Sequence, residues 1–441
     1  MDTHLFQKIG ACMLLSLAFL FSYAEKLPLQ VEMNLHNGAI NQLKVEKDQT
    51  EMNWLIKTDG TQYPWVREDL AWGLGYFTLT HGHESVKKMW NKPVEINSDG
   101  TDVVYREGDI RIQVKRIFQN GDLTEEYTFS NEGKEAVSLY DIGIYTPFND
   151  NYPGAEECIQ ARTNVQVWNG ESAAYLNALR MGGFAPHVGL VVTEGGIKSY
   201  EIWERGAEKG NSQYRGVFAL NPPDLYLKPG ASYTLAWKLF SHEGNDDFKQ
   251  KLLESGSLLV SCDKYVYQKG ETARMEIVSA RPLENYEARL NGVPVAVKWE
   301  NDRYVVEVPL KQLGEVRLDF IYDGGKQTHA DLLVISSERE LLEKRVTFIR
   351  THQQMDRLSD PRYGAYMIYD NEGDSIYLND TPNCNPVDRD EGAERVGMGV
   401  LLAKQFRLTK EEALKASLLK YAKFLQEKLQ TKDYVTYSSV D

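Results

Sequence analysis

Residues 103–129 read VVYREGDIRIQVKRIFQNGDLTEEYTF, and this stretch decides the expected fold. Ile110–Val114 and Thr124–Phe129 alternate in side-chain character with the period of two that a half-buried β-strand shows. Glu107-Gly108-Asp109 and Asn120-Gly121-Asp122 lie where β-hairpins need their turns. The stretch therefore predicts consecutive antiparallel strands.

The same pattern continues outward, with further strands expected at Val188–Val192 and Tyr233–Phe240. A region of this length and strand spacing predicts a large β-sandwich over residues 25–245. Residues 246–256 interrupt it with an amphipathic helical linker, in which Phe248 and Leu252 share one face.

Short strands return over residues 257–335, with turn sequences at Lys269-Gly270 and Asn291-Gly292. This segment predicts one small immunoglobulin-like β-sandwich.

After Ser336 the hydrophobic period changes from two to about 3.6, which indicates helices. Ser337 and Glu340 form a capping box for a helix that reaches about Gln353. A second helix is expected from Glu391 to Gln405, and a third, capped by Thr409 and Glu412, is expected to reach about Gln430. Because three amphipathic helices cannot bury their apolar faces alone, residues 336–441 predict the start of an α/α toroid that the sequence does not complete.

The N-terminus predicts export. Lys8 precedes an apolar run from Ile9 to Phe21, and Ser22-Tyr23-Ala24 matches the pattern of small residues that signal peptidase requires. The apolar run is shorter than the roughly 20 residues that span a bilayer. Residues 1–24 are therefore expected to be a cleaved signal peptide. The mature protein is expected to be secreted, in the periplasm or at the cell surface, without stable membrane insertion.

Composition excludes several functional classes. The formal net charge is −14 and no long basic cluster occurs, so nucleic acid is not an expected partner. Cys158, Cys262 and Cys384 follow the signal without C-x-x-C spacing, which implies neither a disulfide framework nor a zinc ribbon. Phosphate-binding, dinucleotide-binding and serine-hydrolase motifs are missing from the sequence, and no cofactor is expected. The 25 Tyr and 8 Trp suit sugar binding, although sandwich cores also use them for packing.

A family resemblance adds to this interpretation. The order of a large sandwich, a small sandwich and a helical toroid resembles the six-hairpin glycosidases. Residues 63–77, YPWVREDLAWGLGYF, and residues 385–399, NPVDRDEGAERVGMG, resemble exported Bacteroidetes proteins akin to glycoside hydrolase family 154. The resemblance implies glycan breakdown, with a glucuronic acid residue as one possible target.

Glycoside hydrolysis requires two carboxyl groups about 5 to 10 Å apart. Four acids gather where the second helix is expected to begin, and they are the candidate catalytic residues: Asp388, Asp390, Glu391 and Glu394. The alternative is an ordinary helix N-terminus with Asp390 as its cap. Arg389 and Arg395 could bind a substrate carboxylate, or pair with the neighbouring acids.

Trp65, Arg67 and Trp72 combine flat aromatic faces with charge and are candidate substrate-binding residues, the alternative being a loop packed between the sandwich and the toroid. His81-Gly82-His83-Glu84 and Asp370–Asp374 match no established metal-site spacing, so no metal is expected.

The expected partner is a polysaccharide or oligosaccharide, and the favoured function is that of the N-terminal part of a glycoside hydrolase acting on side chains that include uronic acid. Two alternatives remain. One is a non-catalytic protein that binds glycans or a partner through its β-sandwiches. The other is a polysaccharide lyase, although lyases of this type usually place the toroid first.

Overall fold

The structure is a computed structural model that describes residues 27–57, 67–82, 84–150, 154–204, 216–371, 373–376 and 396–437. The chain divides into two compact units. The first comprises the described residues up to Tyr265, with Thr272–Pro309 and Glu315–Leu332, and the second comprises Val266–Glu271, Leu310–Gly314 and the chain from Leu333 onward. Each unit is described separately.

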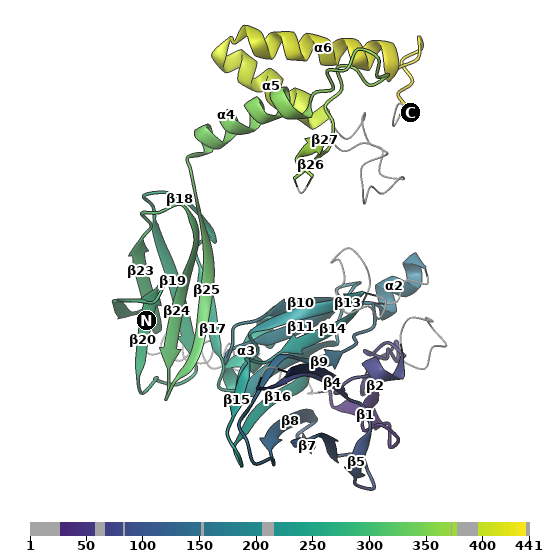
Figure 1. The fold of residues 1–441 in the computed structure, drawn as a ribbon, viewed down its shortest axis with the longest axis vertical. Coiled ribbons are helices and arrows are strands. Elements are labelled where there is room, and N and C mark those ends of the chain that lie inside the picture. Colours follow the sequence, from purple (N-terminus) through teal and green to yellow (C-terminus); the bar gives the residue numbers. More distant parts are fainter. Residues whose placement is uncertain are drawn as a thin grey trace, which may run out of the picture. The chain divides into compact units, whose positions relative to one another are not determined.

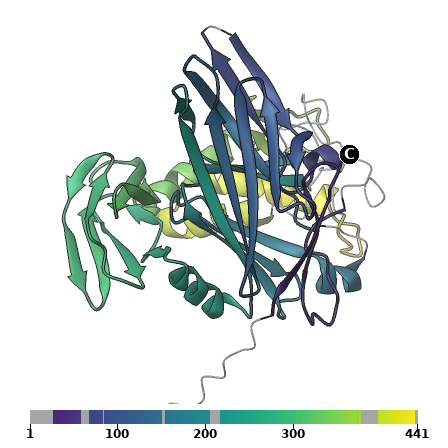
Figure 2. The same ribbon diagram turned by 90° about the horizontal axis from the view of Figure 1, so that it is seen from below.

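Most strands of the first unit belong to two large antiparallel sheets (Figure 1). The eight-stranded sheet has the order β10-β11-β12-β16-β8-β7-β6-β5, and Figure 2 shows its strands side by side. Its strands are β5 (Pro93–Ile96), β6 (Asp102–Glu107), β7 (Ile110–Gln119), β8 (Asp122–Asn131), β10 (Thr163–Trp168), β11 (Tyr175–Arg180), β12 (His187–Glu194) and β16 (Ser232–His242).

The six-stranded sheet has the order β13-β14-β9-β3-β4, with β15 also paired to β9. Its strands are β3 (Gly75–His81), β4 (Glu84–Trp90), β9 (Val137–Thr146), β13 (Ser199–Glu204), β14 (Gly216–Asn221) and β15 (Leu225–Leu227). A separate hairpin of β1 (Leu29–Met33) and β2 (Ile40–Val45) adds to this part, as do the 3-10 turn η1 (Glu68–Leu70) and the helices α2 (Ala155–Ala161) and α3 (Asn245–Glu254).

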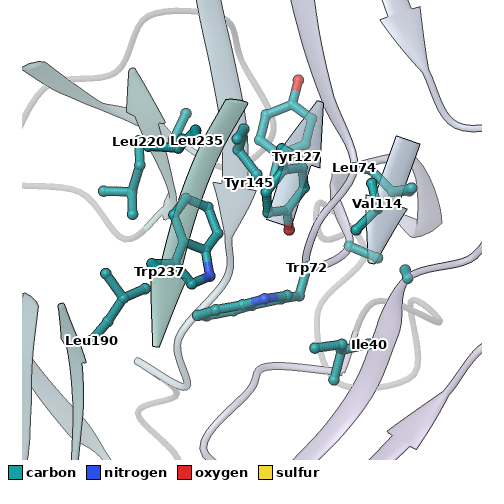
Figure 3. Packing of buried hydrophobic residues seen from close by; sticks show 14 of the residues in the cluster. Ile40, Trp72, Leu74, Val114, Tyr127, Tyr145, Leu190, Leu220, Leu235 and Trp237 are labelled. Atoms are coloured by element: carbon teal, nitrogen blue, oxygen red, sulfur yellow. The ribbon is translucent and has the colours of Figure 1, made fainter. Parts of the chain in front are cut away.

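Alternation along the strands builds one apolar core between these sheets. Ile110, Ile112 and Val114 on β7 are fully buried, while the residues between them are half-exposed. The turn joining β7 to β8 places Asn120 at φ 52° and Gly121 at φ 82°, the conformation of a two-residue hairpin turn, and it pairs Gln119 with Asp122. Figure 3 shows apolar side chains from both sheets meeting in this core. The predicted β-rich architecture with a sandwich is confirmed.

A second pair of sheets follows α3. The four-stranded sheet has the order β17-β19-β23-β22, and the five-stranded sheet has the order β18-β25-β24-β20-β21. Their strands are β17 (Leu258–Cys262), β18 (Val266–Gln268), β19 (Thr272–Ser279), β20 (Tyr286–Leu290), β21 (Val293–Val295), β22 (Val297–Glu300), β23 (Arg303–Pro309), β24 (Gly314–Tyr322) and β25 (Lys326–Ile335). The immunoglobulin-like class of this second pair of sheets stays a prediction.

Helices dominate the second unit. They are α4 (Glu338–Phe348), continued by the π-helical turn η2 (Ile349–Gln353), then α5 (Val396–Thr409) and α6 (Glu412–Lys428). A short hairpin of β26 (Tyr369–Asp370) and β27 (Ser375–Ile376) lies between η2 and α5 in sequence. Within the described ranges, no helix is long and apolar enough to cross a bilayer.

The two predicted helix caps have different outcomes. Ser337 does cap α4, because its side chain accepts a hydrogen bond from the Glu340 amide at 3.3 Å. The predicted Thr409 cap is wrong. Thr409 is the last residue of α5, and its hydroxyl donates back to the Gln405 carbonyl oxygen at 3.1 Å, so Glu411 occupies the N-cap position of α6.

Candidate functional site

Most of the sequence-predicted site residues lie outside the described residues. These are Trp65, Asp388, Arg389, Asp390, Glu391, Glu394 and Arg395. Their roles stay predictions. Arg67 is described, and its guanidinium donates to Asp69 at 2.9 and 3.1 Å on the surface, so its charge is already paired.

Trp72 lies in the core of the first unit and not at a surface that a sugar could reach. Its side chain is 1% exposed, its ring meets Phe148 edge to face at 5.2 Å, and its indole N–H donates to Glu125 Oε2 at 2.7 Å. The predicted contact between Trp72 and substrate is corrected accordingly.

Glu125 is a fully buried carboxylate that collects donors from several strands. Oε2 accepts from the indoles of Trp72 and Trp237, the latter at 3.0 Å. Oε1 accepts from Arg116 Nε at 2.9 Å and from the Tyr127 hydroxyl at 3.1 Å. Burial of this carboxylate without a partner would strongly destabilise the fold. The four donors offset that cost of desolvation. The group has no access to solvent and serves structure.

A cluster of polar and aromatic side chains lies on the second unit, at the end of α4. We name the Phe348 cluster for its members Arg345, Phe348, Thr351, His352, Tyr369 and Asp374. The π-helical turn that carries Thr351 and His352 is itself informative, because π-helical turns are rare and occur often at functional sites.

Aromatic stacking fixes the geometry of the cluster. The exposed His352 ring lies parallel to the Phe348 ring, with centroids 4.7 Å apart and planes 9° apart. Tyr369 meets Phe348 edge to face at 4.9 Å, and its centroid lies 6.2 Å from that of His352. The Arg345 guanidinium lies 5.7 Å from the Phe348 ring centre. One exposed patch thus combines a cation, an imidazole and a phenol.

Proton counting assigns the tautomer of His352. The Thr351 hydroxyl has one proton, and it donates that proton to the Thr347 carbonyl oxygen at 2.8 Å, because a carbonyl can only accept. The same hydroxyl lies 2.7 Å from His352 Nδ1 and must therefore accept there. Nδ1 carries the hydrogen of the neutral imidazole, and Nε2 holds the lone pair that can take up a proton.

Tyr369 is held in its protonated form. Its hydroxyl donates to Asp374 Oδ1 at 2.7 Å, and this hydrogen bond, with the nearby negative charge, raises the pKa of Tyr369 above its ordinary value. The phenol and the imidazole, whose ring centroids lie 6.2 Å apart, provide a proton donor and a proton acceptor. With Arg345 available for a carboxylate, the cluster can support proton abstraction next to a carboxylate.

Metal binding has no support among the residues that can be described, where no group of three or more His, Cys, Asp or Glu side chains converges. Asp370, in the second segment considered for metal binding, lies on β26 and pairs with Ser375 on β27. The side chains of His81 and His83 lie outside the described part.

Sequence reasoning missed both Glu125 and His352. Glu125 had a signal, since the alternation that buries Leu123, Tyr127 and Phe129 also directs residue 125 inward. His352 had none, because its partners come together only through the π-helical turn and the β26–β27 hairpin.

Comparison with known proteins places this architecture in a family. The chain belongs to DUF5695, described as a family of unknown function, whose model matches residues 210–436. That match includes the helical unit and the Phe348 cluster. No curated protein matches the chain.

The chain is also similar to a solved structure described as "Polysaccharide Lyase BACCELL_00875". Identity is 63% and the TM-score is 0.90, over 95% of this chain and 63% of the lyase. The chain thus spans less than two thirds of that protein's length. This homologue confirms the expected relationship to carbohydrate-active proteins, but it does not support a specific relationship to glycoside hydrolase family 154.

Two further solved structures are more distant. A galactose mutarotase-like protein from Lactobacillus casei ATCC 334 is 13% identical with a TM-score of 0.31, over 49% of this chain and 98% of that one. The α-galactosidase AgaA of Geobacillus stearothermophilus is 10% identical with a TM-score of 0.31, over 55% of this chain and 44% of that one. Neither similarity is strong enough to carry an argument.

Proposed function

We propose that this chain is part of a polysaccharide lyase that cleaves a uronic-acid-containing glycan by elimination. The observation that carries the proposal is the 63% identity to a polysaccharide lyase over 95% of the chain. The order of the domains had favoured a hydrolase. It no longer does so, because a lyase shares this order of β-sandwiches followed by helices. Glycoside hydrolysis becomes the alternative.

The Phe348 cluster supplies groups that elimination requires. His352 Nε2 takes the proton from the ring carbon next to the uronate carboxylate, while the Arg345 guanidinium stabilises the charge that develops on that carboxylate. The electrons form a carbon–carbon double bond as the bond to the glycosidic oxygen breaks. Tyr369 is the group that can protonate the departing oxygen: its hydroxyl turns from Asp374 to that oxygen and delivers its one proton as the bond breaks.

The candidate site residues that lie between α4 and α5 in the sequence can be assigned roles in this proposal. Arg389 and Arg395 were predicted to bind a substrate carboxylate, which fits a uronate equally well in an elimination. Asp388, Asp390, Glu391 and Glu394 are the acids that hydrolysis would need, so their importance depends on the reaction type. They are the residues whose substitution distinguishes the two mechanisms.

The finer architecture is also proposed. The helices α4, α5 and α6 would be the first of an α/α toroid, and the second pair of sheets would be immunoglobulin-like. Support for the toroid comes from an apolar groove of about 460 Å³ between α5 and α6, lined by Val396, Val400, Phe406, Leu418, Leu419 and Leu425. In such a toroid, further helices would pack on this groove. Export to the periplasm or cell surface rests on the sequence of residues 1–24 alone.

The test is an assay that separates elimination from hydrolysis. The chain is incubated with pectin, alginate and arabinogalactan, with the similar lyase as a positive control, and two products are measured: the ultraviolet absorbance of unsaturated uronate and the amount of new reducing ends. Elimination yields both, whereas hydrolysis yields reducing ends alone. New reducing ends without absorbance would refute the proposal, and activity without either His352 or Arg345 would refute the assignment of the site.

A further inference from the structure

The first unit contains a cavity at the place where its two pairs of sheets meet. Its volume is about 190 Å³, and its lining includes Trp168, Asn169, Val260, Tyr265, His329 and Asp331. The junction is fixed by the Ser172 amide, which donates to the Gln327 carbonyl oxygen at 3.0 Å, and by Arg317, which donates to Glu171 at 2.6 Å. These contacts hold the cavity walls together.

Two aromatic side chains form the apolar walls. Trp168 ends β10 and is half-buried, and its ring is supported from behind by Tyr175 at a centroid distance of 5.3 Å. Tyr265 follows β17 and is 51% exposed, although it borders a cavity. Flat aromatic faces with a polar edge are the surfaces on which the carbon–hydrogen face of a sugar ring packs well.

Polar groups stand beside these rings. Asp331 keeps 63% of its side chain exposed, and its Oδ2 lies 3.4 Å from Nε2 of the buried His329, an arrangement that orients the carboxylate. The Asn169 amide nitrogen donates to the Lys198 carbonyl oxygen at 2.8 Å, which orients its Oδ1 as an acceptor. Two acceptors beside aromatic walls match the hydroxyl groups of a sugar.

Charge decides which sugar fits. Burial, together with the charge of Arg317, lowers the pKa of His329, so this ring is neutral at neutral pH and provides no cation. Arg317 lies 3.8 Å from Asp331 Oδ1, but the same guanidinium also pairs with Glu171 and Asp319, so the carboxylates here outnumber the one cation. The Asp331 carboxylate would then repel the carboxylate of a uronic acid, whereas it can accept hydrogen bonds from an uncharged ring.

We infer that this junction cavity binds one uncharged pyranose unit of a glycan, at a distance in sequence from the Phe348 cluster and independently of its chemistry. The choice of a glycan rests on the proposed function. The binding itself does not require elimination, so each can fail without the other.

The experiment measures binding and not turnover. Glucose, galactose, mannose and their methyl glycosides are tested against the whole chain by ligand-detected NMR and by titration calorimetry, with glucuronic and galacturonic acid as charged counterparts. Trp168→Ala should weaken binding of the neutral sugar at least about tenfold. Asp331→Asn, at an exposed position that does not threaten folding, should weaken it several-fold, and His352→Gln should leave it unchanged.

Trp299→Ala is the matched control, because Trp299 is 54% exposed on β22 and lies outside the cavity. Binding of a neutral sugar that both cavity variants weaken and Trp299→Ala does not would support the inference. Three results would overturn it: no binding of any neutral sugar, neutral-sugar binding that Asp331→Asn leaves intact, or preferential binding of the uronic acids that Trp168→Ala weakens. If sugar binding is intact in a chain that produces no unsaturated uronate, only the proposed lyase activity fails.

Discussion

Replacing Glu125 by glutamine should unfold the first unit at a distinctly lower denaturant concentration, although the two side chains have nearly the same shape. An amide offers one acceptor oxygen and one donor nitrogen, whereas Glu125 accepts at both oxygens. Whichever way the amide is turned, it directs N–H groups either at the two indoles or at Arg116 and Tyr127. With the amide nitrogen at the indoles, both indole N–H groups lose their acceptor. In the other orientation Arg116 loses its acceptor, while the Tyr127 hydroxyl can turn and accept from the amide.

The magnitude follows from burial. Arg116 and Glu125 both have fully buried side chains, so the substitution also leaves a guanidinium in the core without its counter-charge. Breaking a buried ion pair by removing one partner destabilises by about 3–5 kcal/mol. We expect this range for Glu125→Gln, because the lost counter-charge adds to the roughly 1–2 kcal/mol that the loss of one or two hydrogen bonds would cost alone.

The assay is urea unfolding followed by tryptophan fluorescence. Glu126→Gln is the matched control: Glu126 is the next residue on β8, faces the opposite side of the sheet and is half-exposed, so its change should stay within about 0.5 kcal/mol. The double variant Arg116→Met, Glu125→Gln should recover part of the loss, because no uncompensated charge remains. A Glu125→Gln variant within about 1 kcal/mol of the parent would refute the reasoning.

Three further predictions concern the histidines. His352→Gln should lower the rate of uronate elimination by about 10²–10⁴-fold with the melting temperature unchanged, and equal activity would exclude His352 as the base. Thr351→Val should reduce the rate by roughly tenfold and shift its pH profile, because Nδ1 loses its acceptor, whereas Thr351→Ser should retain the rate. Burial, with a contribution from His187, lowers the pKa of His242 from 6.5 to about 4. The unfolded chain then binds more protons than the folded chain between these values, so stability should fall by on the order of 3 kcal/mol as pH drops from 6.5 to 4. Unfolding midpoints measured across this range check this, and His242→Gln should flatten the curve.

The strands could be predicted because their signals are local. The alternation at Ile110–Val114 and the turn at Asn120-Gly121 depend on neighbouring residues only, and both appear in the structure. Ser337 is a similar case, since a helix cap involves residues three apart. The predicted cap at Thr409 was wrong because the Thr409 hydroxyl can donate to a carbonyl oxygen of the preceding helix as readily as it can cap the next helix.

The site residues were harder because their environment is set by distant segments. Trp72 has the composition of a sugar-stacking residue, and only its burial and its contact with Glu125, 53 positions away, show otherwise. The imidazole of His352 acquires its tautomer from Thr351 and its stacking from Phe348, which no motif records.

The buried carboxylate also determines which alignment of β8 the sandwich accepts. A shift of β8 by one residue would turn Glu125 to the outer face and bring Thr124 or Glu126 inward, because side chains alternate along a strand. With Thr124 inward, Arg116 and the two indoles would lose the carboxylate they contact, and the misaligned sheet would contain a buried charge without a partner. With Glu126 inward a carboxylate would remain, but Leu123, Tyr127 and Phe129 would turn out of the core. An apolar residue of similar size at position 125 could tolerate such a shift, because it has no hydrogen bonds to lose. The Glu125 carboxylate cannot, because it accepts hydrogen bonds from four donors. Glu125 thus favours the observed register of β8 and disfavours the registers shifted by one residue.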